Sequence, residues 1–139
     1  MATTYSKVLL SWYKSTAHRG IVSEADYQET GYNPKCGDRL TFYVGGDQST
    51  GVKSIRYVPE ACMLCTASAE AAVKFCLSDE KLVSQLIREV EAIAGEKFKS
   101  GIAVEFEQPL YETLKAYPAR ETCLTLPWNT MASLLKKLK

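Results

Sequence analysis

Residues 39–60, RLTFYVGGDQSTGVKSIRYVPE, decide the fold of this chain. The runs RLTFYV (39–44) and GVKSIRYVPE (51–60) alternate apolar and polar residues and are rich in β-branched and aromatic side chains. The glycine-rich stretch GGDQST (45–50) separates them. Two such runs joined by a short glycine-containing connection predict an antiparallel hairpin. A small antiparallel sheet is therefore the centre of the predicted structure.

Helices are expected before and after this hairpin in the sequence. Residues 18–35 are polar and punctuated by Gly and Pro, which predicts a loop with one edge strand. Helical periodicity or composition predicts helices in residues 4–17, 65–95 (split at Ser78 or Asp79 and ended by Gly95), 108–116 and 120–139. Pro127 must lie near the first turn of the last helix or kink it. The order predicts one α+β domain over residues 1–139, with about three strands and helices packed on one face.

Composition narrows the functional classes. The chain has 139 residues, of which 46% are hydrophobic and 24% charged, so it can bury a core. A net charge of +1 gives no electrostatic case for binding nucleic acid or an anionic membrane. No apolar run approaches the ~20 residues of a membrane span. The N-terminus lacks the pattern of a secretory signal, so a cytoplasmic protein is expected.

The cysteines indicate a metal-binding or sulfur-handling site. The chain has five, an odd number, and a reducing compartment favours metal or sulfur chemistry over disulfides. The five are Cys36, Cys62, Cys65, Cys76 and Cys123.

The pair Cys62 and Cys65, in CMLC, has two interpretations by spacing alone. A thioredoxin-type redox pair would need a parallel βαβ unit, and half of a zinc knuckle would need a second CxxC. The chain offers a hairpin and a single CxxC. The pair does fall at a predicted strand-to-helix junction, where exposed N–H groups favour an anionic thiolate.

The hairpin predicts which thiols are neighbours. Cys36, in NPKCGD (33–38), immediately precedes the first strand, and Cys62 immediately follows the second. In an antiparallel pair the start of one strand lies beside the end of the other. Asp38 would join the two thiols, and Cys123 is a candidate fourth ligand. The set Cys36, Asp38, Cys62 and Cys123 would make a tetrahedral zinc site.

These residues also have simpler interpretations. The three cysteines could be buried apolar thiols, and Asp38 could cap a turn. Cys76 is expected in the core. Cys65 has two interpretations: it is either a core residue at the start of a helix or an accessory thiol near the metal.

Two basic residues have more than one interpretation by sequence. His18 is expected to interact with the C-terminal dipole of the first helix rather than to bind a metal. Arg120 is either solvated or placed to hold an anionic persulfide.

Three motifs resemble one protein family. NPKCGD (33–38), EACMLCTASA (60–69) and YPARETCLTLPW (117–128) are similar to motifs of the U-type iron–sulfur cluster assembly proteins, the family of IscU, the NifU N-terminal domain and SufU. The resemblance extends from the N-terminal helix to about residue 135. It implies a SufE/IscU-like fold and a site in which Cys36, Asp38, Cys62 and Cys123 bind zinc or a nascent cluster.

Within the family the chain looks most like SufU. The scaffold branch has a histidine before the third cysteine, where this chain has Thr122, and a Leu-Pro-Pro-Val-Lys chaperone-binding motif that has no counterpart here. The 61 residues from Cys62 to Cys123 imply an insertion relative to that branch. Cys65 departs from the family, which usually has serine at this position.

The SufU resemblance implies a zinc-dependent sulfur acceptor for a SufS-like cysteine desulfurase, that is, a persulfide sulfurtransferase. Cys36 is the preferred acceptor and Cys123 the second choice. The alternative is a scaffold that assembles a [2Fe–2S] cluster on the same residues and passes it to apo iron–sulfur proteins. A third hypothesis is a structural zinc module that binds a protein partner.

Overall fold

The computed structural model describes residues 4–22 and 24–139. A three-stranded sheet is preceded by one helix and followed by four, with a short 3-10 turn before the last. The elements are α1 (Thr4–Lys14), β1 (Tyr27–Asn33), β2 (Asp38–Asp47), β3 (Gly51–Glu60), α2 (Met63–Ser78), α3 (Val83–Gly95), α4 (Val104–Ala116), η1 (Pro118–Arg120) and α5 (Glu121–Leu135).

The sheet is an antiparallel meander with the strand order β1-β2-β3. Strands β2 and β3 are the hairpin predicted from residues 39–60, and β1 is the edge strand predicted within residues 18–35. On β2, Leu40, Phe42 and Val44 are buried while the residues between them are more exposed. One face of the sheet therefore carries the core.

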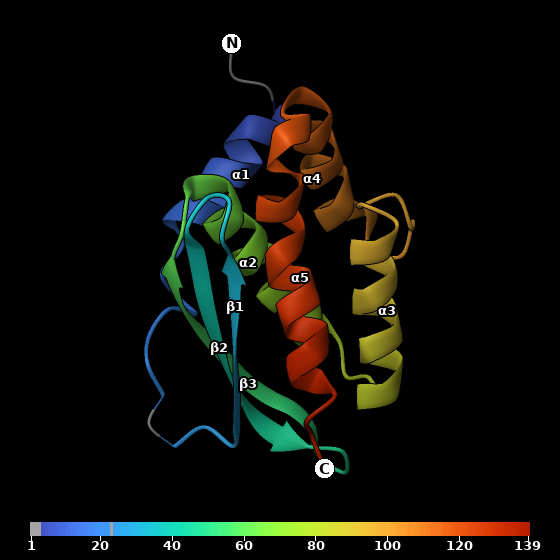
Figure 1. The fold of residues 1–139 in the computed structure, drawn as a ribbon. Coiled ribbons are helices and arrows are strands. Elements are labelled where there is room, and N and C mark those ends of the chain that lie inside the picture. The colour runs from blue at the N-terminus through green and yellow to red at the C-terminus, as the bar shows by residue number, and fades with distance from the viewer. Residues whose placement is uncertain (1–3, 23) are drawn as a thin grey trace.

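Helices α2 and α5 cover that face (Figure 1). Helix α1 packs on α2 and α4, and α3 packs on α5. The predicted α+β architecture, with a small antiparallel sheet and helices on one face, is confirmed. None of the helices in the described ranges is long and apolar enough to span a bilayer.

The bounds of helices α1 and α4 differ from the predicted ones. Helix α1 ends at Lys14 rather than near residue 17. Helical spacing places Tyr5 on the apolar face of this helix, but its side chain is not among those that the structure describes. Helix α4 begins at Val104 rather than at residue 108, because the buried Glu107 carboxylate accepts hydrogen bonds from the N–H groups of Ser100 and Ala103. Pro127 lies inside α5, beyond its first turn.

A buried carboxylate joins three segments of the core. Glu70 of α2 is fully buried, and its Oε1 accepts a hydrogen bond from the Tyr57 hydroxyl at 2.8 Å. Burial raises the pKa of Tyr57 above its usual range, so the phenol remains a donor. The other oxygen, Oε2, lies 2.8 Å from His18 Nδ1. The expectation that His18 interacts with a helix C-terminus is wrong, because α1 ends at Lys14 and the imidazole pairs with Glu70 instead.

Helix α5 approaches strand β1 closely at Gly31. A Cβ atom on this glycine would lie 2.0 Å from Thr130 Oγ1 and 3.2 Å from Leu126 Cδ1. The Thr130 hydroxyl is buried and donates to the Leu126 carbonyl at 2.7 Å, so it cannot move away freely. Glycine at residue 31 therefore permits the contact that brings α5 onto the sheet.

We expect Gly31→Ala to lower the free energy of unfolding by about 1–3 kcal/mol, the usual cost of overpacking a core. Gly95→Ala is the matched control, since a Cβ at the end of α3 meets no atom within 4 Å and its effect should stay within about 1 kcal/mol of the native value. Urea denaturation of both variants measures the difference. Equal stabilities would show that the α5–β1 approach is not tight.

Candidate metal centre

The turn at residues 34–37 presents Cys36 to solvent. Asn33 and Asp38 pair across β1 and β2, so only four residues connect the strands. The Gly37 N–H closes the turn by donating to the Asn33 carbonyl at 2.8 Å, and Gly37 has a φ of +71°, which glycine adopts without strain. Cys36 is consequently an exposed thiol at the tip of a tight turn.

Asp38, the first residue of β2, is 2% exposed. Its Oδ1 accepts a hydrogen bond from the Cys62 N–H at 2.9 Å, which links the start of β2 to the segment after β3. Its Oδ2 is buried and has no hydrogen-bond partner among the described residues. A buried carboxylate oxygen without a partner is costly and calls for a cation or a donor.

Cys62 caps the N-terminus of α2. Its backbone is extended (φ −66°, ψ 167°), and its Sγ accepts a hydrogen bond from the Cys65 N–H at 3.4 Å. The thiol of Cys65 is fully buried. Burial, and then the neighbouring Asp38 and Cys62, raise the pKa of Cys65 above its usual range.

Cys123 lies in the first turn of α5 and is buried. Its Sγ is 3.4 Å from the Sγ of Cys36. Asn33 Nδ2 donates to the same sulfur at 3.8 Å, and Arg120 Nη1 lies 3.8 Å from the sulfurs of both Cys36 and Cys123. Asn33 is the residue that the sequence interpretation missed, although it begins the motif NPKCGD.

The electrostatic environment keeps Cys123 protonated in the absence of a cation. Burial, followed by the adjacent Asp38 carboxylate and Cys36 thiol, raises the pKa of Cys123 to about 12, while Arg120 acts in the opposite direction. A bound metal ion would reverse this balance, because thiol ligands bind as thiolates.

Cys36, Asp38 and Cys123 converge on one point. Their potential ligand atoms all lie within 4.8 Å of one another, and they form the only such group of His, Cys, Asp or Glu found in the described part of the chain. Two thiols and a carboxylate are a donor set that suits zinc. The Cys62 sulfur is not in this group, although its backbone holds Asp38. The four-ligand set therefore stays a prediction, with three members already together and the fourth beside them.

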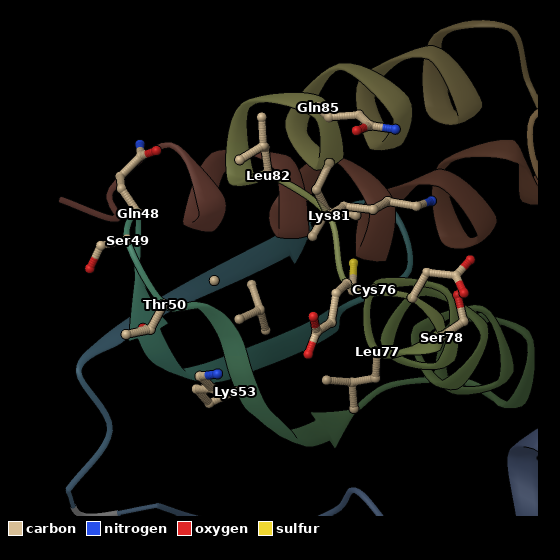
Figure 2. Close-up of a pocket in the computed structure, with 15 residues that line it drawn as sticks. Gln48, Ser49, Thr50, Lys53, Cys76, Leu77, Ser78, Lys81, Leu82 and Gln85 are labelled. Carbon is tan, nitrogen blue, oxygen red and sulfur yellow. The ribbon is translucent and has the colours of Figure 1, made fainter.

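The remaining cysteine lies elsewhere. Cys76 is buried, as expected, and lines a cavity of about 720 Å³ between residues 48–53 and 76–86 (Figure 2). This cavity lies at the start of β3 and the end of α2. The cluster of Cys36, Asp38 and Cys123 lies at the opposite end, near the end of β3 and the start of α2. The two places are therefore separate.

Comparisons with known proteins identify the family of the chain and its fold. Residues 4–123 match the model of the NifU-like N terminal domain family. The iron–sulfur cluster assembly scaffold protein IscU of Thermotoga maritima is 31% identical over 136 residues, which cover 96% of this chain and 94% of that protein.

Two solved structures have the same fold. A putative iron–sulfur cluster assembly scaffold protein for the SUF system from Fervidobacterium islandicum superposes with a TM-score of 0.78 at 21% identity, covering 94% of this chain and 96% of that one. A nitrogen-fixing NifU-like protein (N-terminal) from Brucella abortus gives 0.77 at 18% identity, covering 95% and 92%. The family that the three cysteine motifs indicated is confirmed: the chain belongs to the NifU-like N-terminal domain family, to which IscU and SufU proteins are related.

Proposed function

We propose that this protein is an iron–sulfur cluster assembly scaffold, on which a nascent [2Fe–2S] cluster is held as cargo by Cys36, Asp38 and Cys123, with Cys62 as the fourth ligand. The observation that carries the proposal is the convergence of two cysteine sulfurs on a buried carboxylate, one oxygen of which has no hydrogen-bond partner among residues 4–22 and 24–139. The similarity to a scaffold protein from Thermotoga maritima supports this alternative better than the sulfur-acceptor hypothesis preferred from the sequence.

The placement of the ligands suits assembly and release. Cys36 is exposed, so iron and sulfide can reach the site from solvent at the 34–37 turn. Asp38 and Cys123 are buried and fixed by β2 and α5. A carboxylate is a harder ligand than a thiolate and binds soft metal centres less firmly. A site with one carboxylate should therefore release its cargo to apo iron–sulfur proteins more readily than a four-cysteine site.

A second candidate is a zinc-dependent sulfur acceptor for a cysteine desulfurase, working in the cytoplasm. It is favoured by the exposure of Cys36 and by Arg120, which lies beside its sulfur. In this function the Cys36 thiolate attacks the outer sulfur of the partner's persulfide, takes that sulfur as Cys36–S–SH, and leaves the partner's thiolate. Zinc held by the same four residues would keep the thiols deprotonated at neutral pH.

Replacing any one of Cys36, Cys62 or Cys123 by serine should sharply reduce the visible absorbance that develops when the protein is incubated anaerobically with ferrous iron and sulfide. The physical reason is the loss of a thiolate ligand. Cys76→Ser is the matched control and should behave as the native protein, because Cys76 lies at the other end of α2. If the three ligand variants all assembled a native amount of cluster, the proposed site would be wrong.

Substitutions of Asp38 separate its two roles. Asp38→Asn should keep an acceptor for the Cys62 N–H and fold as the native protein, but should bind metal more weakly because the anionic ligand is gone. Asp38→Ala should also lower the free energy of unfolding, by about 1–3 kcal/mol, since the part-buried Cys62 N–H loses its partner. Metal content after dialysis and urea denaturation are the measurements. Native metal content in Asp38→Asn would exclude this carboxylate as a ligand.

Asp38→Cys tests the sulfur-acceptor candidate. A four-thiolate site should retain zinc at least as well as the native one, yet should open less readily for sulfur transfer. We therefore expect native zinc content but a clearly smaller stimulation of cysteine desulfurase turnover. Equal stimulation by the native protein and Asp38→Cys on the same preparations would contradict the opening of the site.

A further inference from the structure

The sulfurs of Cys36 and Cys123 lie 3.4 Å apart, although 87 residues separate them in the chain. We propose that these two thiols form a reversible disulfide that closes the candidate metal centre, so that an external disulfide can switch the site off and a thiol reductant can restore it. Cys36 is exposed and Cys123 is buried. This is the asymmetry expected of one thiol that meets an external oxidant and a second that resolves the product.

The surroundings permit the small movement that bond formation requires. The distance must shorten from 3.4 Å to the ~2.0 Å of a disulfide bond. Residues 34–37 are exposed, and no atom lies near the position of a Cβ on Gly37, so the turn has room to shift. Cys123 is fixed by α5, since the Ser68 hydroxyl donates to the Leu124 carbonyl at 2.6 Å and accepts from Trp128 Nε1 at 3.0 Å. Cys36 therefore moves toward Cys123.

The oxidant is a low-molecular-weight disulfide, written RSSR, and the reaction has two exchange steps. Cys36 attacks RSSR, forming Cys36–S–SR and releasing the first RSH. Cys123, whose sulfur lies 3.8 Å from Arg120 Nη1, then gives up its proton to the departing RS⁻ as it attacks the Cys36 sulfur, forming the Cys36–Cys123 bond and releasing the second RSH. Two protein thiols lose two electrons and two protons, and one RSSR becomes two RSH. A thiol reductant reverses both steps.

Cys62 and Cys65, three residues apart at the start of α2, are the other cysteine pair near the site. The Cys62 sulfur accepts the Cys65 N–H, and the Cys65 thiol is fully buried. A mixed disulfide on Cys62 would have to be resolved by the fully buried Cys65 thiol, whereas Cys123 already contacts the exposed sulfur of Cys36. The observations therefore favour Cys36–Cys123.

The functional consequence depends on the function proposed above. A disulfide between Cys36 and Cys123 removes two of the sulfur ligands at once, so neither a cluster nor zinc can be held. Conversely, a bound metal ion occupies both sulfurs and should protect them from exchange. The site could then bind a metal ion or a cluster only in reducing conditions.

The test is oxidation of the chelator-treated, reduced full chain with glutathione disulfide, followed by acid quenching, alkylation and peptide mapping without reductant. We expect one linked pair of peptides containing Cys36 and Cys123, which disappears after treatment with dithiothreitol. Cys123→Ser should instead accumulate a stable glutathione adduct on Cys36, and Cys76→Ser should give the native result. The proposal would be overturned if the oxidised native protein carried only glutathione adducts or a Cys62–Cys65 link.

Thermal unfolding supplies a second readout that does not depend on metal loading. A cross-link between residues 36 and 123 constrains the unfolded chain, so the oxidised native protein should have a higher Tm than the reduced protein, while Cys36→Ser should show no such rise. Failure of the native protein to form the link in a chain that still assembles a cluster refutes the disulfide alone. A chain that forms the link but never binds iron–sulfur or zinc refutes the proposed function alone.

Discussion

The approach of α5 to β1 at Gly31 is the contact on which the site depends. It is possible only because residue 31 has no Cβ to meet Thr130. With the helix seated there, its first turn places Cys123 against the turn that carries Cys36. The same helix also covers the core face of the sheet, so the packing that stabilises the fold and the convergence of the ligands have one origin.

The candidate metal centre combines a buried part with an exposed part. Asp38 and Cys123 are withdrawn from water. This burial raises the pKa of Cys123 and leaves Asp38 Oδ2 without a hydrogen-bond partner in the described part of the chain. Such a group is unfavourable by itself, and a cation bound between the thiols and the carboxylate would remove the penalty. Cys36, by contrast, stays at the surface. Cargo, a persulfide or an oxidant would all meet this thiol first.

Local sequence patterns account for a large part of the structure and of the site. The alternation in residues 39–60 predicts the hairpin, and antiparallel pairing then brings the residues before its first strand to those after its second. This predicts that the thiols of Cys36 and Cys62 are neighbours, with Asp38 beside them. Asp38 does meet the backbone of Cys62 through a hydrogen bond, but the sulfur in contact with Cys36 is that of Cys123. The bounds of α4 were less predictable, because the segment before it is held by the buried Glu107 carboxylate, which accepts hydrogen bonds from the N–H groups of Ser100 and Ala103.

Only the tertiary structure decided the rest. The sequence by itself determined the hairpin, the helices and the family motifs, because these depend on residues close together in the chain. Nothing in the local pattern places Cys123 within 3.4 Å of Cys36, brings Asn33 and Arg120 to their sulfurs, or pairs His18 with Glu70. Those contacts arise where α5 and α2 pack against the sheet. Their geometry is set by the shapes of buried side chains from distant segments, which periodicity and spacing do not encode.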